Sequence, residues 1–243
     1  MINTLIKKVR TSRYYENLKK NKVLRALKDK YDQNVYMNKS NNLKKYGVEA
    51  LLLLKESFSQ IDKTYWLDYG TLLGAIREKD FIGHDKDIDI GTFDFSDEEK
   101  LKLQEILFSK GFKKYKQYEL AGKIIEESYD YNGVHIDIFY YHQLDDEKIW
   151  CYFCEIGFDM SFENYPTYQL AKGYRINKVV SRFSGLTEYE FKGDKFYIPS
   201  NYHEYLVDNY LESYMEINPD WPGDGAKNIF PVNNDDVLVK EFI

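Results

Sequence analysis

The stretch "YGTLLGAIREKDFIGHDKDIDI", residues 69–90, decides the predicted fold. It opens with the pair Gly70 and Thr71 and closes with three alternating aspartates, Asp85, Asp87 and Asp89. Alternate residues of a β-strand share one face, so "DKDIDIGTF" predicts a strand with its carboxylates on one face and the isoleucines Ile88 and Ile90 on the core face. Like charges repel at this spacing. The pattern therefore predicts a cation beside the aspartates.

A second strand supplies another carboxylate. In "VHIDIF" (134–139) His135 and Asp137 alternate with three apolar residues. If this strand pairs beside the first, Asp137 joins the aspartates. Carboxylate oxygens in this number suit Mg²⁺ or Mn²⁺. Carboxylates of this kind can also accept a proton from an attacking hydroxyl, so we interpret the group as a metal-binding catalytic cluster.

The start of the stretch predicts a phosphate site. Gly70 and Thr71 stand where a strand turns into a helix, and backbone N–H groups at such a helix start favour phosphate. Arg77 lies two helical turns further and could clamp phosphate oxygens with both of its terminal nitrogens. Together with the aspartates, these residues suit in-line displacement at phosphorus.

Each feature also has a simpler interpretation. Isolated D-x-D pairs occur on solvated loops, Gly70 alone could serve only a turn, and Arg77 alone could serve a surface ion pair. Asp137 could be one polar residue of a half-exposed strand. The combination within one segment favours the functional interpretation.

The rest of the chain predicts an α+β domain with a small mixed sheet. An apolar stripe predicts a core helix over residues 43–61, and "TYWLDY" (64–69) predicts a short buried strand. "SDEE" (96–99) is a capping box that starts a helix. Asn132-Gly133 predicts a hairpin, and a further helix is expected over 201–215.

Charge divides the chain into two parts. Residues 1–46 hold 13 Lys and Arg against 3 Asp and Glu, whereas the remainder holds 21 against 37. We interpret residues 1–42 as a basic helical segment that contacts a membrane surface or another chain, and 43–243 as the catalytic domain. No apolar run approaches the ~20 residues of a membrane-spanning helix. With only two cysteines, Cys151 and Cys154, the composition favours a cytoplasmic protein.

The segment "WLDYGTLLGAIREKDFIGHDKDIDI" resembles the signature of the LicD-type, fukutin-like phosphotransferases. "VHIDIF" resembles the later aspartate strand of that family, and "FKGDKFYIPSNYHEYLVDNYLESYM" (191–215) its C-terminal segment. The resemblance implies a nucleotidyltransferase-like fold of the polymerase-β type, with a small mixed sheet flanked by helices. It also implies transfer of a phospho-alcohol from a CDP-linked donor, such as CDP-choline, CDP-glycerol or CDP-ribitol, to a glycan hydroxyl.

On this resemblance the metal ligands are Asp87, Asp89 and Asp137, and Asp85, His84 and His135 lie around them. Gly83-His84 stand where the family has proline-tryptophan. Two alternatives stay open: an NTP-dependent nucleotidyltransferase of the same fold, and a catalytically silent module that binds nucleotide or glycan. We expect a CDP-linked donor and a glycan acceptor, lipid-linked or capsular, as partners, and no nucleic acid. Peripheral contact with the inner membrane face follows from residues 1–42.

Overall fold

The structure is a computed structural model, and it describes residues 22–83, 85–217, 226–232 and 237–242. Three helices and two strands form its first half: α3 (Lys22–Gln60), β1 (Tyr65–Leu67), α4 (Tyr69–Arg77), β2 (Asp87–Phe93) and α5 (Asp97–Ser109). Next come five strands, β3 (Lys113–Leu120), β4 (Lys123–Tyr131), β5 (Val134–Asp145), β6 (Lys148–Asn164) and β7 (Tyr168–Arg182). The last elements are β8 (Leu186–Phe191), β9 (Asp194–Pro199), α6 (Tyr202–Tyr210), the 3-10 helix η1 (Glu212–Met215), β10 (Ile229–Val232) and β11 (Val237–Phe242).

Six of these strands close into a ring. Antiparallel pairing runs from β3 to β4, β5, β6, β7 and β11, and β11 pairs back with β3. A second cluster of buried apolar side chains comes from strands of this ring and includes Tyr118, Tyr174, Ile176 and Val239. The ring is therefore a small antiparallel barrel with an interior filled by side chains.

The barrel corrects the predicted fold. We expected a small mixed sheet flanked by helices in a nucleotidyltransferase-like fold, and that prediction is wrong, since the described strands make an eleven-stranded sheet that contains the barrel. The reason is physical: β11 reaches β3 from more than 100 positions away along the chain. Pairing over such a separation leaves no local sequence pattern.

A second sheet region extends from the barrel and carries the aspartates. Beyond β5, the sheet continues through β2, β1, β9 and β8. β2 lies parallel to β5 and antiparallel to β1. β5 belongs to both regions, because it pairs with the barrel strand β4 along one edge and with the aspartate strand β2 along the other.

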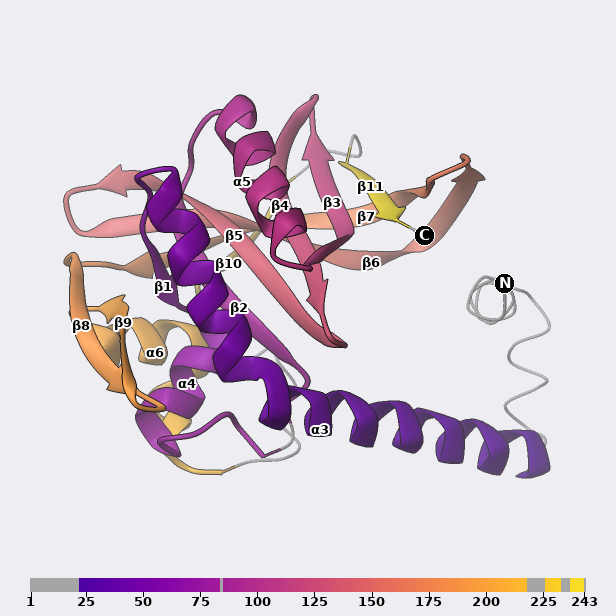
Figure 1. Cartoon of the computed structure of the whole chain (residues 1–243), viewed down its shortest axis with the longest axis horizontal. Helices are drawn as coiled ribbons and strands as arrows, with labels where there is room; N and C mark the ends of the chain where they lie inside the picture. Colours follow the sequence, from indigo (N-terminus) through magenta and orange to yellow (C-terminus); the bar gives the residue numbers. More distant parts are fainter. Residues whose placement is uncertain (1–21, 84, 218–225, 233–236, 243) are drawn as a thin grey trace.

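Helix α3 crosses one face of this sheet, over β2 and β5 (Figure 1). The second half of α3 buries Leu43, Leu51, Leu54 and Phe58 in the main core, whereas its first half projects from the body (Figure 1). α3 thus contains the predicted helix 43–61 and runs without a break through the predicted boundary after residue 42. Residues 1–21 of the basic segment lie outside the described residues, so its membrane or oligomer contact stays a prediction. Within the described residues, none of the helices combines the length and apolar character needed to cross a membrane.

Several local predictions are confirmed. Ser96 caps α5 and exchanges hydrogen bonds with Glu99 in the predicted capping box. Asn132 and Gly133 join β4 to β5 with positive φ angles of 52° and 81°, the conformation that an Asn-Gly hairpin turn requires. The predicted helix 201–215 is divided, because Leu211 has a φ of 67° between α6 and η1.

Candidate active site

The site begins where β1 turns into α4. Asp68 caps α4, and its side chain accepts the Tyr69 N–H at 2.8 Å. It is fully buried and also accepts the hydroxyls of Tyr141 at 2.7 Å and Tyr205 at 2.8 Å. Burial raises the pKa of Asp68 to about 6, although these hydrogen bonds oppose the shift. The Asp68 carboxylate therefore joins β1, β5 and α6 at the start of α4.

Gly70 and Thr71 attach the start of α4 to β2. The Gly70 N–H donates to Asp89 Oδ2 at 3.1 Å, and the Asp89 N–H donates to Thr71 Oγ1 at 2.9 Å. A Cβ on residue 70 would lie 2.8 Å from Asp85 Oδ2 and 3.3 Å from Asp89 Oδ2. A side chain at residue 70 would force these carboxylates to shift, which favours the glycine. The predicted phosphate cradle thus holds the Asp89 carboxylate.

The strand register brings the aspartates of two strands together. In the parallel pair β2–β5, Asp89 lies opposite Asp137 and Asp87 opposite His135. Ile88 and Ile90 are fully buried on the other face, as predicted. Asp85 precedes β2, and its side chain shares a hydrogen bond with Asp87. The predicted pairing of the two aspartate strands is therefore confirmed.

Burial and mutual repulsion disfavour the ionised form of these aspartates. The pKa of Asp85 rises to about 8 through burial and the charge of Asp87. Burial raises the pKa of Asp89 well above its usual range, with further contributions from Asp87, Asp85 and Asp137. The pKa of Asp137 rises to about 6, mainly through burial, and a hydrogen bond to Ser128 opposes that rise. Positive charge at this place would stabilise the ionised forms.

The donor set fits a hard divalent cation by its chemistry, since it offers only carboxylate oxygens. As the side chains stand, however, the described residues contain no group of three or more His, Cys, Asp or Glu side chains arranged to hold a metal ion. The fit therefore rests on the crowding of buried carboxylates, and the metal stays a prediction.

The comparison with known families matches residues 62–201 to a family described as "LicD/FKTN/FKRP, nucleotidyltransferase domain". This match covers more than half of the 243 residues and includes the segment from Gly70 to Asp137. The chain belongs to the LicD family. The predicted resemblance is confirmed, and membership makes the chain a phosphotransferase-type protein.

Two relatives are uncharacterised rickettsial proteins. One from Rickettsia typhi is 28% identical over 130 residues, which are 50% of this chain and 38% of the relative. One from Rickettsia prowazekii is 32% identical over 120 residues, which are 44% of this chain and 41% of the relative. The matched part of this LicD protein thus spans about two fifths of either relative's length.

Arg77 lies at the other end of α4 from the aspartates of this LicD protein. Its Nη1 donates to the Tyr214 carbonyl at 3.1 Å and its Nη2 to Glu78 Oε1 at 2.7 Å. The side chain is 9% exposed. The structure therefore does not bring Arg77 to the aspartates, and its role as a phosphate clamp stays a prediction.

The two predicted histidines have different outcomes. His84 lies outside the described residues. His135 lies beside the cluster, with Nδ1 3.4 Å from Lys39 Nζ and Nε2 3.6 Å from Asp130 Oδ2. Its ring packs against Tyr115 with centroids 4.4 Å apart. Burial and the neighbouring Lys39 charge lower the pKa of His135, which favours the neutral imidazole.

Three residues near the cluster escaped the sequence analysis. Asp68 stands within the quoted motif, and a buried helix cap before Gly70 could have been suspected there. Tyr210 has its pKa raised by burial and by Asp89 and Asp85, which places it against the same carboxylates. Lys39 comes from α3, and no spacing relates it to the motif.

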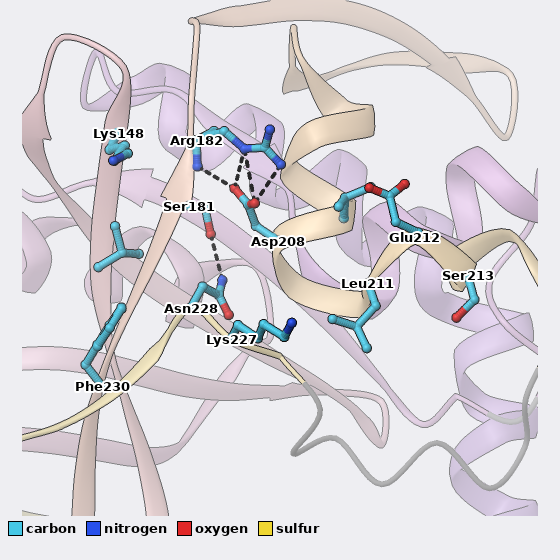
Figure 2. A pocket seen from close by; sticks show the side chains of 12 residues that line it. Lys148, Ser181, Arg182, Asp208, Leu211, Glu212, Ser213, Lys227, Asn228 and Phe230 are labelled. Carbon is cyan, nitrogen blue, oxygen red and sulfur yellow. Dashed lines mark hydrogen bonds and ion pairs between the residues drawn. The ribbon is translucent and has the colours of Figure 1, made fainter.

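A separate hollow of about 650 Å³ lies between β7, α6 and the start of β10 (Figure 2). Asp208 lines it and pairs with Arg182 at 2.7 Å, whereas Tyr210, two residues further along α6, is the residue whose pKa burial and the charges of Asp89 and Asp85 raise. Lys148, Ser181 and Phe230 also line it, and none of the predicted site residues does. The reacting centre predicted for this LicD chain is therefore distinct from this hollow.

Proposed function

We propose that the protein transfers a phospho-alcohol from a CDP-linked donor to a hydroxyl of a cell-surface glycan and releases CMP. The alcohol would be choline, glycerol or ribitol. One observation carries the proposal: the β2–β5 register sets Asp89 opposite Asp137, with Asp85 and Asp87 beside them, in a chain of a phosphotransferase-type family. Buried carboxylates grouped in this way suit chemistry at a phosphate.

In this proposal Asp87, Asp89 and Asp137 hold Mg²⁺ or Mn²⁺. When bound, the cation would neutralise charge on the donor diphosphate. Asp85 contacts Asp87 and lies against Gly70, so it would steady the ligands from the side of α4. Thr71 would keep β2 in register with α4 through its bond from the Asp89 N–H.

The reaction would be an in-line displacement. The glycan hydroxyl oxygen forms a bond to the phosphorus that carries the alcohol, and the bond from that phosphorus to the bridging oxygen breaks. CMP leaves with that oxygen. The hydroxyl proton passes to a carboxylate, for which we propose Asp137, because β5 carries it to the edge of the cluster next to the barrel.

A donor screen tests this function. The purified protein is incubated with Mn²⁺, a set of glycan acceptors and CDP-choline, CDP-glycerol or CDP-ribitol, and CMP is measured. The proposal expects acceptor-dependent CMP release from one donor and none in excess EDTA. Undiminished release in EDTA would contradict the metal role. Metal-dependent binding of CDP without turnover of any donor would instead favour a silent binding module.

We also propose that residues 1–42 bring the protein to a lipid-linked acceptor at the cytoplasmic membrane face. The excess of basic residues in this segment supports it. Co-sedimentation with vesicles that contain anionic lipid should be strong for the whole chain and lost when residues 1–21 are removed. Equal binding to neutral vesicles would contradict the electrostatic basis.

A further inference from the structure

Lys39 approaches the aspartates from an element that the motif does not include. It lies on α3 where this helix passes the segment before β2 and the start of β5. The neighbouring Ser40 is buried, and its Oγ donates to the Gly83 carbonyl at 3.4 Å. One turn earlier, the Tyr36 ring lies 5.4 Å from Lys86 Nζ. These contacts place α3 against the edge of the aspartate cluster.

The Lys39 side chain is held by His135. Its Nζ lies 3.4 Å from His135 Nδ1. An ammonium group has only donors, so Nδ1 must accept, and the ring proton then lies on Nε2, toward Asp130 Oδ2 at 3.6 Å. One of the three N–H bonds of Lys39 is used in this contact. In the part of the chain that the structure describes, Lys39 makes no other side-chain hydrogen bond, so its other two N–H groups can serve a ligand.

The charge of Lys39 acts on the cluster without closing an ion pair. Asp87 and Asp137 are the carboxylates that act on it most, yet none of the carboxylates in the described ranges lies within 4.0 Å of its Nζ. The side chain is half-buried. A cation that is partly removed from water without a paired anion is unfavourable, and an anionic ligand would relieve that cost.

Two other cations near the cluster already have anionic or carbonyl partners, and a third, Lys86, is exposed to solvent. Lys116 acts on Asp137, but its Nζ lies 3.8 Å from Glu241 Oε1 on β11. Arg77 is bonded to Glu78 and the Tyr214 carbonyl. Lys39 is thus the cation best placed to meet a negatively charged substrate beside Asp87 and Asp137.

We infer that Lys39 binds phosphate oxygens of the substrate diphosphate and that His135 positions it. The inference rests on the proposed function, because it takes a diphosphate as the ligand of the aspartate site. The ligand is then held from two sides, by the cation at the carboxylates of β2 and β5 and by the ammonium group from α3. This arrangement places α3 in the substrate site of the protein.

Calorimetric titration tests the inference, with CDP and inorganic pyrophosphate as probes in the presence of Mn²⁺. Lys39→Met should weaken binding of both probes about 10- to 100-fold, since a hydrogen bond to a charged group contributes about 1.5–3 kcal/mol. Lys39→Arg should restore most of the affinity. His135→Ala should weaken binding less than Lys39→Met, because it removes only the support. Lys44→Met, an exposed lysine of the same helix, is the matched control and should bind as wild type does.

Thermal unfolding of each variant shows whether it is folded. A folded Lys39→Met that binds CDP and pyrophosphate as tightly as wild type overturns the inference and leaves the proposed function standing. Wild-type protein that binds neither probe with Mn²⁺ overturns both. Lysine-dependent binding without CMP release from any donor supports the inference and rejects the proposed transfer.

Discussion

The two ends of helix α4 make different contacts, although the helix is only nine residues long. At the first end, Gly70 and Thr71 bond to Asp89, and Asp68 anchors the turn in the core. At the last end, Arg77 is bonded to Glu78 and to the Tyr214 carbonyl beyond α6. The motif joins these residues in one line of sequence, whereas the helix separates its ends by about 1.5 Å per residue.

The difference teaches that one motif can combine reactive and structural roles. The first end contacts the carboxylates that we assign to chemistry, and the second fastens α4 to the η1 region. Substitutions at the first end should therefore change activity, and substitutions at the second should change stability.

The largest effect is expected at the aspartates. Asp87→Asn or Asp89→Asn should reduce CMP release at least about 100-fold, because each removes a charged ligand of the proposed metal site. Asp62→Asn is the control, since Asp62 is exposed and its φ of 55° suits asparagine as well. Activity within a few-fold of wild type in both cluster variants would contradict the site.

Gly70→Ala should act next most strongly. The new Cβ would lie 2.8 Å from Asp85 Oδ2, so the carboxylates must move. A displacement of about 1 Å at a reacting centre can cost ~100-fold in rate, and we expect a loss of 10- to 100-fold. Gly83→Ala is the matched control, because its Cβ would meet nothing within 4 Å. Equal CMP release by the two alanine variants would show that the close approach at Gly70 is unimportant.

Arg77→Met should separate the two ends directly. It removes buried hydrogen bonds of a charged group and should lower the free energy of unfolding by about 1–3 kcal/mol, measured by denaturant titration. Calorimetric binding of CDP with Mn²⁺ should stay within about twofold of wild type. Lys102→Met, an exposed lysine of α5, is the control for charge. Loss of CDP binding at unchanged stability would instead support the predicted role of Arg77 as a phosphate clamp.

The smallest expected effect is on the pH dependence of stability. Asp137 and Asp85 have pKa values raised to about 6 and about 8 in the folded protein, above the usual 3.8. The folded state then binds more protons than the unfolded state between about pH 4 and pH 8, so stability falls as pH rises through this window. In EDTA the unfolding temperature should drop by a few degrees between pH 6 and pH 8.

Asp85→Asn removes the carboxyl whose pKa is raised to about 8. It should therefore flatten the upper part of the plot of unfolding temperature against pH. Mn²⁺ should raise the unfolding temperature more at pH 8 than at pH 6, because the ionised carboxylates bind it. An unfolding temperature that rises from pH 6 to pH 8 in EDTA, in wild type and Asp85→Asn alike, would contradict the repulsion.

Local patterns predicted much of the aspartate region. Alternation in "DKDIDIGTF" identified β2 and its two faces, and the Asn-Gly pair identified the β4–β5 hairpin. The faces of both strands suggested that Asp137 joins the aspartates if the strands pair, and the structure adds that the pairing is parallel and sets Asp137 opposite Asp89. These features depend on neighbours within a few residues, or on one hydrophobic face that must be buried.

Long-range contacts were not predictable in the same way. Lys39 reaches His135 across 96 positions, and Arg77 reaches the Tyr214 carbonyl across 137. Neither contact has a period or a spacing that one sequence displays. The barrel was missed for the same reason, since its closing strand pairs edge to edge with strands made long before it.

That closing strand also sets the order of events during synthesis. β11 follows β3, β4, β5, β6 and β7 along the chain, and it pairs with both β3 and β7. Until the ribosome has released it, these two strands keep unpaired edges, and such edges attract other strands. The nascent chain is therefore most exposed to aggregation just before its last described strand emerges, and the aspartate region has all its strands by then.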